Sequence, residues 1–142
     1  MDYAFWDSSS LIPLCVKQRT TPIAQALSTQ YMIAAWWSTP VEMRSAFARL
    51  HRMGQLTLSE HVQAQILLDK MRSDWLEVHP TEPLREQAER LVERFPLKAA
   101  DAQQLAATLA WCVGRPKGRA FISGDSQLLD AARQLGFQVI EA

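Results

Sequence analysis

The chain has few of the features that mark secreted, membrane or disordered proteins. Its two cysteines, Cys15 and Cys112, form no CxxC spacing, so we expect buried free thiols in a reducing compartment rather than a disulfide. Seven prolines and five glycines against 48% hydrophobic residues argue against disorder. No apolar run approaches the roughly 20 residues of a membrane span, and the first residues lack the basic start of a signal peptide. We therefore expect a cytoplasmic globular protein with no membrane partner.

Several enzyme signatures are also missing. The sequence has no GxxxxGK[ST] phosphate loop, no GxGxxG dinucleotide turn and no GxSxG nucleophile elbow. His51, His61 and His79 show no HExxH or paired spacing, so we expect surface or packing roles for them and no zinc site. Trp36 and Trp37 could stack on nucleic-acid bases, but a core or interface role explains them as simply.

Net charge does not favour a protein that binds nucleic acid by bulk attraction, because 15 Lys and Arg residues balance 15 Asp and Glu residues. The basic residues are nevertheless clustered in two segments: Arg44, Arg49 and Arg52, and Arg115, Lys117 and Arg119. Solvated helix faces explain either cluster equally well.

Hydrophobic periodicity predicts strands that alternate with helices over a single domain, residues 1–142. Strands are expected at 2–6, 31–36, 75–79, 119–123 and 137–140. Helices are expected at 8–17, 22–29, 40–53, from 57 or 59 to 74, and at 82–94, 99–113 and 126–135. Thr39 is the expected N-cap of the third helix, and Thr57 or Ser59 that of the fourth. The order predicts an α/β three-layer sandwich, in which helices flank a mostly parallel sheet of about five strands.

Four acidic residues stand at the ends of these predicted elements. Asp7 and Asp125 each follow a strand, at the edge where ligands bind in parallel sheets. Glu42 and Asp101 each open a helix beside its apolar stripe. Taken singly, each acid could be a helix cap or a first-turn acid that favours the helix dipole.

Taken together, the four carboxylates indicate a metal site. Two unit charges about 4 Å apart repel by roughly 4 kcal/mol at an effective dielectric of 20, so several such pairs need a cation or raised pKa values. Oxygen ligands favour Mg²⁺ or Mn²⁺. A further acid, Asp69, falls in mid-helix away from any strand end, and we expect it to be structural.

The four segments resemble a PIN domain of the VapC toxin type. The resemblance runs from Asp2 to the C-terminus and is carried by Trp6-Asp7-Ser8-Ser9-Ser10-Leu11, Trp36-Trp37-Ser38-Thr39-Pro40-Val41-Glu42, Leu97-Lys98-Ala99-Ala100-Asp101-Ala102-Gln103-Gln104-Leu105-Ala106 and Phe121-Ile122-Ser123-Gly124-Asp125-Ser126-Gln127-Leu128. Each segment alone is weakly diagnostic, whereas all four in this order form a specific pattern. The chain departs from many relatives at Ser45, where they carry Asn.

The resemblance implies a metal-dependent endoribonuclease, the toxin of a type II toxin–antitoxin module, that cuts RNA such as tRNA or rRNA and arrests translation. A VapB-like antitoxin partner and a homodimer are also implied. A catalytically silent PIN-fold RNA-binding or interaction module, and a DNA- or RNA-processing nuclease outside toxin–antitoxin systems, remain alternatives.

The mechanistic hypothesis assigns a role to each group of residues. Asp7, Asp101 and Asp125, with Glu42 directly or through water, hold one or two Mg²⁺ or Mn²⁺ ions that assist attack of water on the phosphate. This route leaves a 5′-phosphate and a 3′-hydroxyl. The hydroxyls of Ser8, Ser9 and Ser123 are expected to orient the carboxylates, although Ser9 and Ser123 could equally cap a helix or turn. Arg44, Arg115 and Lys117 are the candidates for phosphate contacts.

Overall fold

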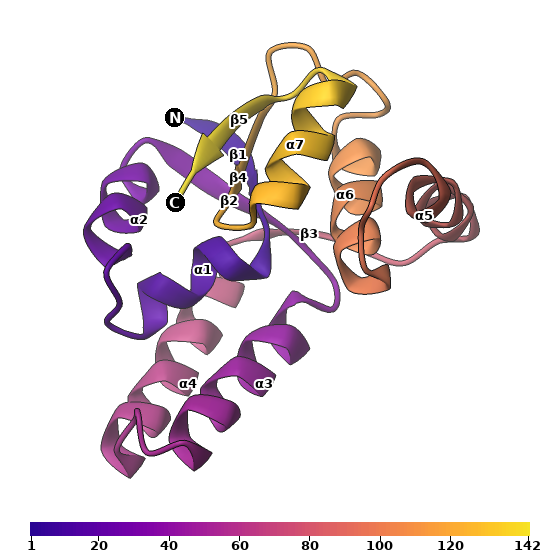
Figure 1. Ribbon diagram of the computed structural model, residues 1–142. Coiled ribbons are helices and arrows are strands. Elements are labelled where there is room, and N and C mark those ends of the chain that lie inside the picture. The colour runs from indigo at the N-terminus through magenta and orange to yellow at the C-terminus, as the bar shows by residue number, and fades with distance from the viewer.

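A five-stranded, fully parallel sheet forms the centre of the molecule (Figure 1). The computed structural model describes residues 1–142. The strands are β1 Asp2–Trp6, β2 Tyr31–Trp36, β3 Leu76–Val78, β4 Ala120–Ser123 and β5 Gln138–Glu141. Their spatial order is β3-β2-β1-β4-β5, so the chain moves outward from β1 first to one side of the sheet and then to the other. The α/β class and the predicted number of strands are confirmed.

Seven helices connect and cover the strands. They are α1 Ser8–Cys15, α2 Thr21–Ser28, α3 Thr39–Arg52, α4 Leu58–Arg72, α5 Glu82–Arg94, α6 Ala99–Trp111 and α7 Ser126–Leu135. The predicted boundaries agree within two residues, and the largest differences lie at helix C-termini, where terminal turns loosen. Gly136 ends α7 in the left-handed conformation, φ 104°, as its position after the helix predicts.

The structure decides the predicted N-caps of α3 and α4. Thr57, rather than Ser59, caps α4: its hydroxyl accepts from Glu60 N at 3.1 Å while the Glu60 carboxylate accepts from Thr57 N at 2.9 Å. The prediction that Thr39 is an N-cap is wrong. Ser38 takes that position without a side-chain hydrogen bond, and Thr39 lies buried in the first turn of α3.

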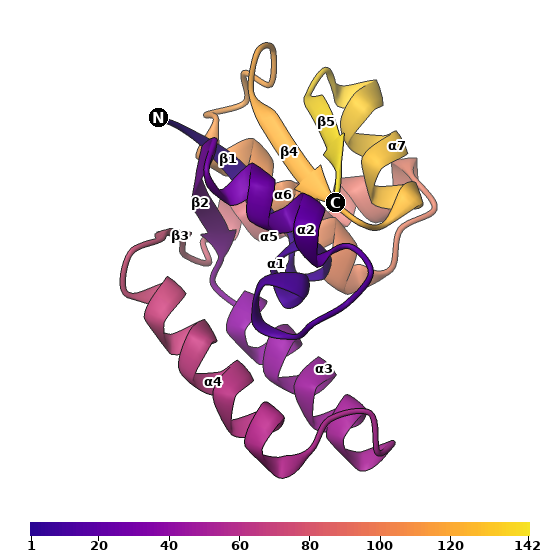
Figure 2. The same ribbon diagram turned by 90° about the vertical axis from the view of Figure 1, so that its left-hand side faces the viewer.

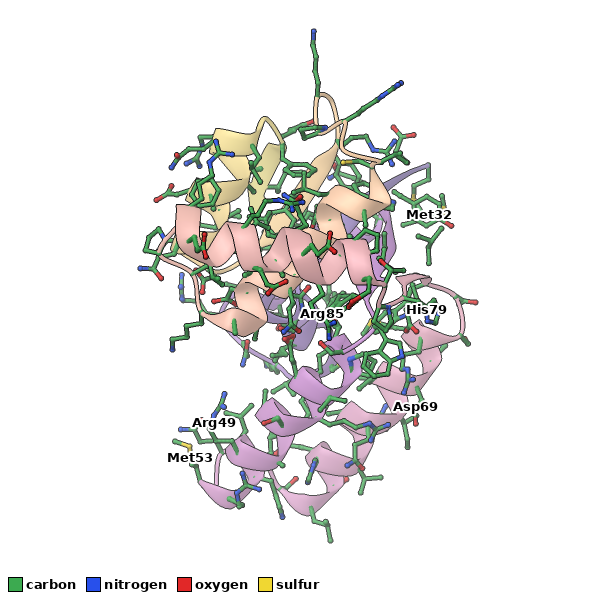
Figure 3. The ribbon with its side chains drawn as sticks, turned by 90° about the vertical axis from the view of Figure 1, so that its right-hand side faces the viewer. Met32, Arg49, Met53, Asp69, His79 and Arg85 are labelled. Carbon is green, nitrogen blue, oxygen red and sulfur yellow. The ribbon has the colours of Figure 1, made fainter.

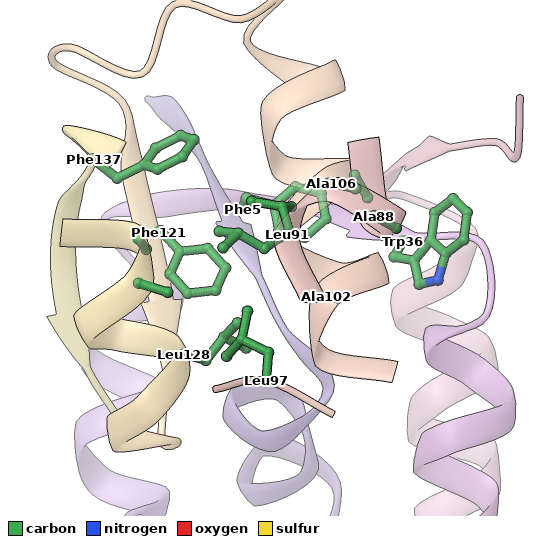
Figure 4. Packing of buried hydrophobic residues seen from close by; sticks show 14 of the residues in the cluster. Phe5, Trp36, Ala88, Leu91, Leu97, Ala102, Ala106, Phe121, Leu128 and Phe137 are labelled. Carbon is green, nitrogen blue, oxygen red and sulfur yellow. The ribbon is translucent and has the colours of Figure 1, made fainter. Parts of the chain in front are cut away.

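Apolar side chains fill both faces of the sheet, which is why its strands read as nearly continuous hydrophobic runs. Phe5 and Phe121 pack on one face against α5, α6 and α7, as Figure 4 shows for Phe121 beside Leu128. Their strand neighbours Trp6 and Ile122 point to the opposite face and pack with residues of α1, α3 and α4. The alternation gives two cores, one on each side of the sheet.

Helices α3 and α4 form a hairpin that extends away from the sheet (Figure 2). Arg44 of α3 donates to Asp69 of α4 at 2.7 Å, and the Arg44 side chain is partly and that of Asp69 mostly exposed. This ion pair confirms the structural role expected for Asp69, which is labelled on α4 in Figure 3. None of the seven helices combines the length and apolar character that a membrane crossing requires.

Candidate active site

Asp7 is the most buried acid of the chain and lies where β1 passes into α1. Its side chain is only 3% exposed. One carboxylate oxygen accepts from Ser10 N at 3.1 Å, and the Ser9 hydroxyl lies 2.8 and 2.9 Å from the two oxygens. The Ser123 hydroxyl donates to Oδ2 at 3.0 Å. Burial raises the pKa of Asp7 to about 6, and these hydrogen bonds only partly oppose the shift.

The residues around Asp7 join β1 to β4, where the strand order of the sheet reverses. Asp7 N donates to Ile122 O at 3.2 Å, and Gly124 N donates to the Ser9 hydroxyl at 2.9 Å. Such a switch point between two strands is where ligands of open parallel sheets bind. Ser9 and Ser123 therefore hold a carboxylate at this point, as the sequence predicted.

Asp125 follows β4 at the same edge of the sheet and caps α7. Its Oδ1 accepts from Leu128 N at 3.0 Å, which is the N-cap role that Asp at this position predicts. Its own backbone N–H donates to the Ser123 hydroxyl at 3.0 Å, so Ser123 contacts both Asp7 and Asp125. One serine thus connects the acids that follow β1 and β4.

Glu42 is held from α6 by Gln104, for which we predicted no role from the sequence. Gln104 Nε2 donates to Glu42 Oε2 at 2.7 Å and to the Thr39 hydroxyl at 3.0 Å. Gln104 is only 1% exposed, and its Oε1 is buried without a hydrogen-bond partner. Burial raises the pKa of Glu42, whereas Gln104 and the Ser8 hydroxyl favour the charged form. Ser8 thus acts on Glu42 rather than on Asp7.

Asp101, in the first turn of α6, links Glu42 to Asp125 electrostatically. Burial raises the pKa of Asp101, the charge of Asp125 raises it further, and Lys98 opposes the rise. The charge of Asp101 in turn raises the pKa of Glu42. No Lys, Arg or His forms an ion pair with Asp7, Glu42, Asp101 or Asp125. The fold therefore brings these acids to one region without an ion pair to any of them, and Lys98 acts on Asp101 only from a longer distance.

The four carboxylates are not drawn together around a single point. No group of three or more His, Cys, Asp or Glu side chains lies close enough to hold one metal ion. Instead, the charge of Asp101 acts on Glu42, and the charge of Asp125 acts on Asp101. Asp7 and Asp125 are connected by hydrogen bonds that both make with the Ser123 hydroxyl.

The structure separates two of the predicted phosphate-binding residues from this region. Arg115 and Lys117 lie in the loop between α6 and β4, before the amino end of β4, whereas Asp7 and Asp125 follow the carboxyl ends of β1 and β4. Because the strands are parallel, these two basic residues lie at the opposite edge of the sheet. Arg44 is in the hairpin, where it pairs with Asp69.

The histidines and cysteines take no part in the site. His51 and His61 pack against each other on the hairpin, with ring centroids 4.9 Å apart, and His79 lies near Glu77. Cys15 and Cys112 are buried free thiols, as expected from their isolation in the sequence. The chemistry of the site is therefore that of oxygen ligands alone.

Comparison with known proteins identifies the architecture. No protein-family model matches the chain, and no curated protein matches its sequence. Among solved structures, it is similar to Mycobacterium tuberculosis VapC20, a sarcin–ricin loop cleaving toxin, with a TM-score of 0.66 and 17% identity over 90% of this chain and 94% of that chain. The chain has a PIN-like fold.

Two further structures with the PIN-like fold come from toxin–antitoxin systems. VapBC2 from Rickettsia felis, bound to a DNA fragment from its promoter, gives a TM-score of 0.65 and 11% identity, with 99% of this chain and 98% of that chain covered. A toxin–antitoxin complex from Klebsiella pneumoniae gives a TM-score of 0.59 and 17% identity, with 87% of this chain and 88% of that chain covered. The predicted resemblance to PIN-domain VapC-type toxins is therefore confirmed at the level of the fold.

On the proposal made below, that Glu42 helps to hold a catalytic metal ion, replacing Gln104 by methionine is expected to lower RNA cleavage about 10- to 100-fold, the range for loss of a residue that orients a metal ligand. Methionine keeps the apolar bulk but removes the donor that fixes Glu42. RNA cleavage rates of the purified Gln104→Met and wild-type proteins measure the effect, with Gln63→Met, on the exposed face of α4, as the matched control. Equal rates in all three proteins would show that Gln104 does not position Glu42 for catalysis.

Proposed function

We propose that this protein is a metal-dependent endoribonuclease, the toxin of a type II toxin–antitoxin module, which inhibits translation and growth by cutting RNA. The observation that carries the proposal is the gathering of Asp7, Glu42, Asp101 and Asp125 near one edge of a PIN-like sheet with no basic side chain paired to any of them. The fold neighbour that cleaves the sarcin–ricin loop supports a ribonuclease in particular.

The donor atoms at this edge of the sheet suit a hard divalent cation, and binding one requires the acidic side chains to move closer together, because no three of them lie close enough to hold one ion. Every available ligand is a carboxylate oxygen, apart from the amide oxygen of Gln104, which is buried without a donor. Oxygen donors suit Mg²⁺ and Mn²⁺ and disfavour zinc. Asp7, Asp101 and Asp125 would hold the ion or ions, with Glu42 contributing directly or through water. When bound, such an ion lowers the pKa of water and stabilises charge on a phosphate.

The surrounding side chains limit how the carboxylates can move. Ser9, Ser10 and Ser123 together fix both oxygens of Asp7. Gln104 orients Glu42 from the opposite side of the site. Because these donors favour the ionised carboxylates, they oppose the protonation that burial encourages. The chain thus keeps two of its acids oriented, and these hydrogen bonds offset part of the rise in their pKa values.

The biological setting of the proposal follows from the fold neighbours. Structures of toxin–antitoxin complexes with this fold support a VapB-like antitoxin as the partner. A homodimer is the default assembly for a chain of this kind, and an RNA substrate of this kind is consistent with a cytoplasmic protein. Arg44 remains a candidate phosphate contact if RNA displaces Asp69, whereas Arg115 and Lys117 would reach only a distant part of a long RNA.

The proposal is tested by incubating the purified protein with single-stranded RNA, structured tRNA and flapped DNA in Mg²⁺, Mn²⁺ or EDTA. We expect RNA cleavage that requires the metal and leaves 5′-phosphate and 3′-hydroxyl ends, because water rather than the 2′-hydroxyl is the nucleophile. Sequencing of RNA 5′ ends after induced expression of wild type and Asp7→Ala then identifies the target.

Three results would contradict the proposal. Products with 2′,3′-cyclic phosphates, or unchanged cleavage in EDTA, would exclude metal-assisted hydrolysis. Cleavage of flapped DNA alone would favour a DNA-processing nuclease. A folded protein that binds RNA but cleaves none of the three substrates would favour a silent PIN-fold module.

A further inference from the structure

A largely apolar groove of about 360 Å³ lies between the carboxyl end of β2, α5 and the start of α6. Trp36, Trp37 and Ser38 form its β2 side, and Ala99 and Gln103 of α6 also line it. The α5 side is made by Leu84, Arg85, Ala88, Glu89 and Val92. In Figure 3 Arg85 lies between α5 and α3. This volume lies within the range of small-molecule sites.

Two tryptophans give the groove an aromatic wall. Trp36 is buried and lies beside Ala88 (Figure 4). Trp37 is 52% exposed, and its ring packs edge-on against Trp36 with the centroids 6.5 Å apart and the planes at 66°. The contact leaves much of the Trp37 indole open to solvent. An exposed ring supported by a buried one is a suitable platform for stacking another flat ring.

Trp36 is only 3% exposed, and its indole Nε1 is buried without a hydrogen-bond partner, out of reach of a ligand in the groove. Trp36 therefore contributes packing to the groove rather than a hydrogen bond.

The groove adjoins the acidic site through two pairs of neighbouring residues. Ser38 and Gln103 line the groove, and the next residues in the chain, Thr39 and Gln104, are hydrogen bonded to each other at 3.0 Å. The same Gln104 amide holds Glu42 at 2.7 Å. A polymer whose phosphate lies at the acids can therefore place an adjacent unit in the groove.

We propose that the groove binds a nucleobase of the RNA strand, next to the phosphate at the acidic site. The base stacks on the exposed Trp37 ring. This assignment rests on the proposed ribonuclease function and adds a subsite that holds one unpaired base. Stacking of this kind accepts any base.

The test measures binding without cleavage, using the full chain carrying Asp101→Asn. Fluorescein-labelled homopolymers of A, C and U, and an abasic ribose–phosphate strand of the same length, are titrated by fluorescence anisotropy. We expect the best homopolymer to bind roughly 5- to 150-fold more tightly than the abasic strand, the range of one base–aromatic stack. Adding Trp37→Ala should remove this difference. Adding Trp36→Phe keeps an aromatic ring against Trp37 and should preserve most of this difference.

The controls separate the groove from general effects. Met53→Ala removes an exposed apolar residue at the far end of the hairpin (Figure 3) and should leave all affinities unchanged. Thermal unfolding verifies that each variant is folded. Three results would overturn the assignment: equal affinities for homopolymers and the abasic strand, no measurable binding of any strand, or no effect of Trp37→Ala. The groove would then be a site for a side chain of a partner protein. Metal-dependent cleavage by the wild type is measured separately, so the nuclease proposal can stand when the groove assignment fails.

Discussion

Replacing Asp101 by asparagine is expected to lower the rate of RNA cleavage by more than about a hundredfold. A catalytic metal ion supplies several kcal/mol of transition-state stabilisation, and each 1.36 kcal/mol corresponds to about tenfold in rate. The charge of Asp101 acts on Glu42 and is acted on by Asp125, so its replacement removes the carboxylate that both of these acids have as a neighbour. The measurement is the cleavage rate of one RNA substrate at saturating Mn²⁺.

The matched control for this prediction is Asp69→Asn. Asp69 is also a helical aspartate, but it is exposed and pairs only with Arg44. Its replacement should leave cleavage nearly unchanged, because exposed ion pairs contribute about 0–1 kcal/mol to stability. Full activity in Asp101→Asn, or an equal loss in Asp69→Asn, would contradict the assignment of the site.

Replacing Asp7 by asparagine is expected to make the metal-free protein more stable at neutral pH. Burial raises the pKa of Asp7 to about 6, from an ordinary value of 3.8. Between these values the folded chain retains a proton that the unfolded chain has released, so the free energy of unfolding falls as pH rises through this window. At pH 7 the ionised, buried carboxylate costs the folded state about 3 kcal/mol. Asparagine carries no such charge.

Urea unfolding in EDTA at pH 4.5 and pH 7.5 measures this effect. The stability of Asp7→Asn relative to wild type should increase by about 2 kcal/mol between the lower and the higher pH. The comparison across pH removes the constant cost of changing the hydrogen bonds from Ser9 and Ser123. A difference between the two proteins that does not vary with pH would show that Asp7 is ionised in the folded state at both pH values.

The sequence allowed the fold to be predicted because its local signals agree with its topology. Runs such as Tyr3-Ala4-Phe5-Trp6 are apolar on both sides of the strand, as strands of a doubly covered parallel sheet must be. Pro40, Gly136 and the Thr57–Glu60 pair mark helix ends close to where they occur. Where a segment carries such helix start and stop signals, short-range preferences decide its structure.

The site was harder to predict because its contacts connect distant parts of the chain. The four acids were selected from their places at strand and helix ends, and Ser9 and Ser123 were expected to orient carboxylates without any indication that both contact Asp7. Gln104 was missed, since a glutamine within a helix has no distinctive local signal. It is marked only by its place on the buried face of α6, between Ala102 and Leu105.

The basic residues illustrate a different limit of sequence reasoning. Arg115 and Lys117 form a cluster in the sequence, but clustering does not reveal at which edge of the sheet a loop lies. That position follows from the topology: a loop that enters a parallel strand lies opposite the loop that leaves it. Once β4 is placed beside β1, the segment before β4 is directed away from Asp7.

The central claim is that the acids at this edge of the sheet bind a divalent cation, and calorimetric titration of the metal-free protein with Mn²⁺ tests it most directly. The account predicts saturable binding by the wild type and by Asp69→Asn, with binding lost or greatly weakened in Asp7→Asn and Asp101→Asn. Absence of saturable binding by the folded wild type, or equal affinity in all four proteins, would contradict it.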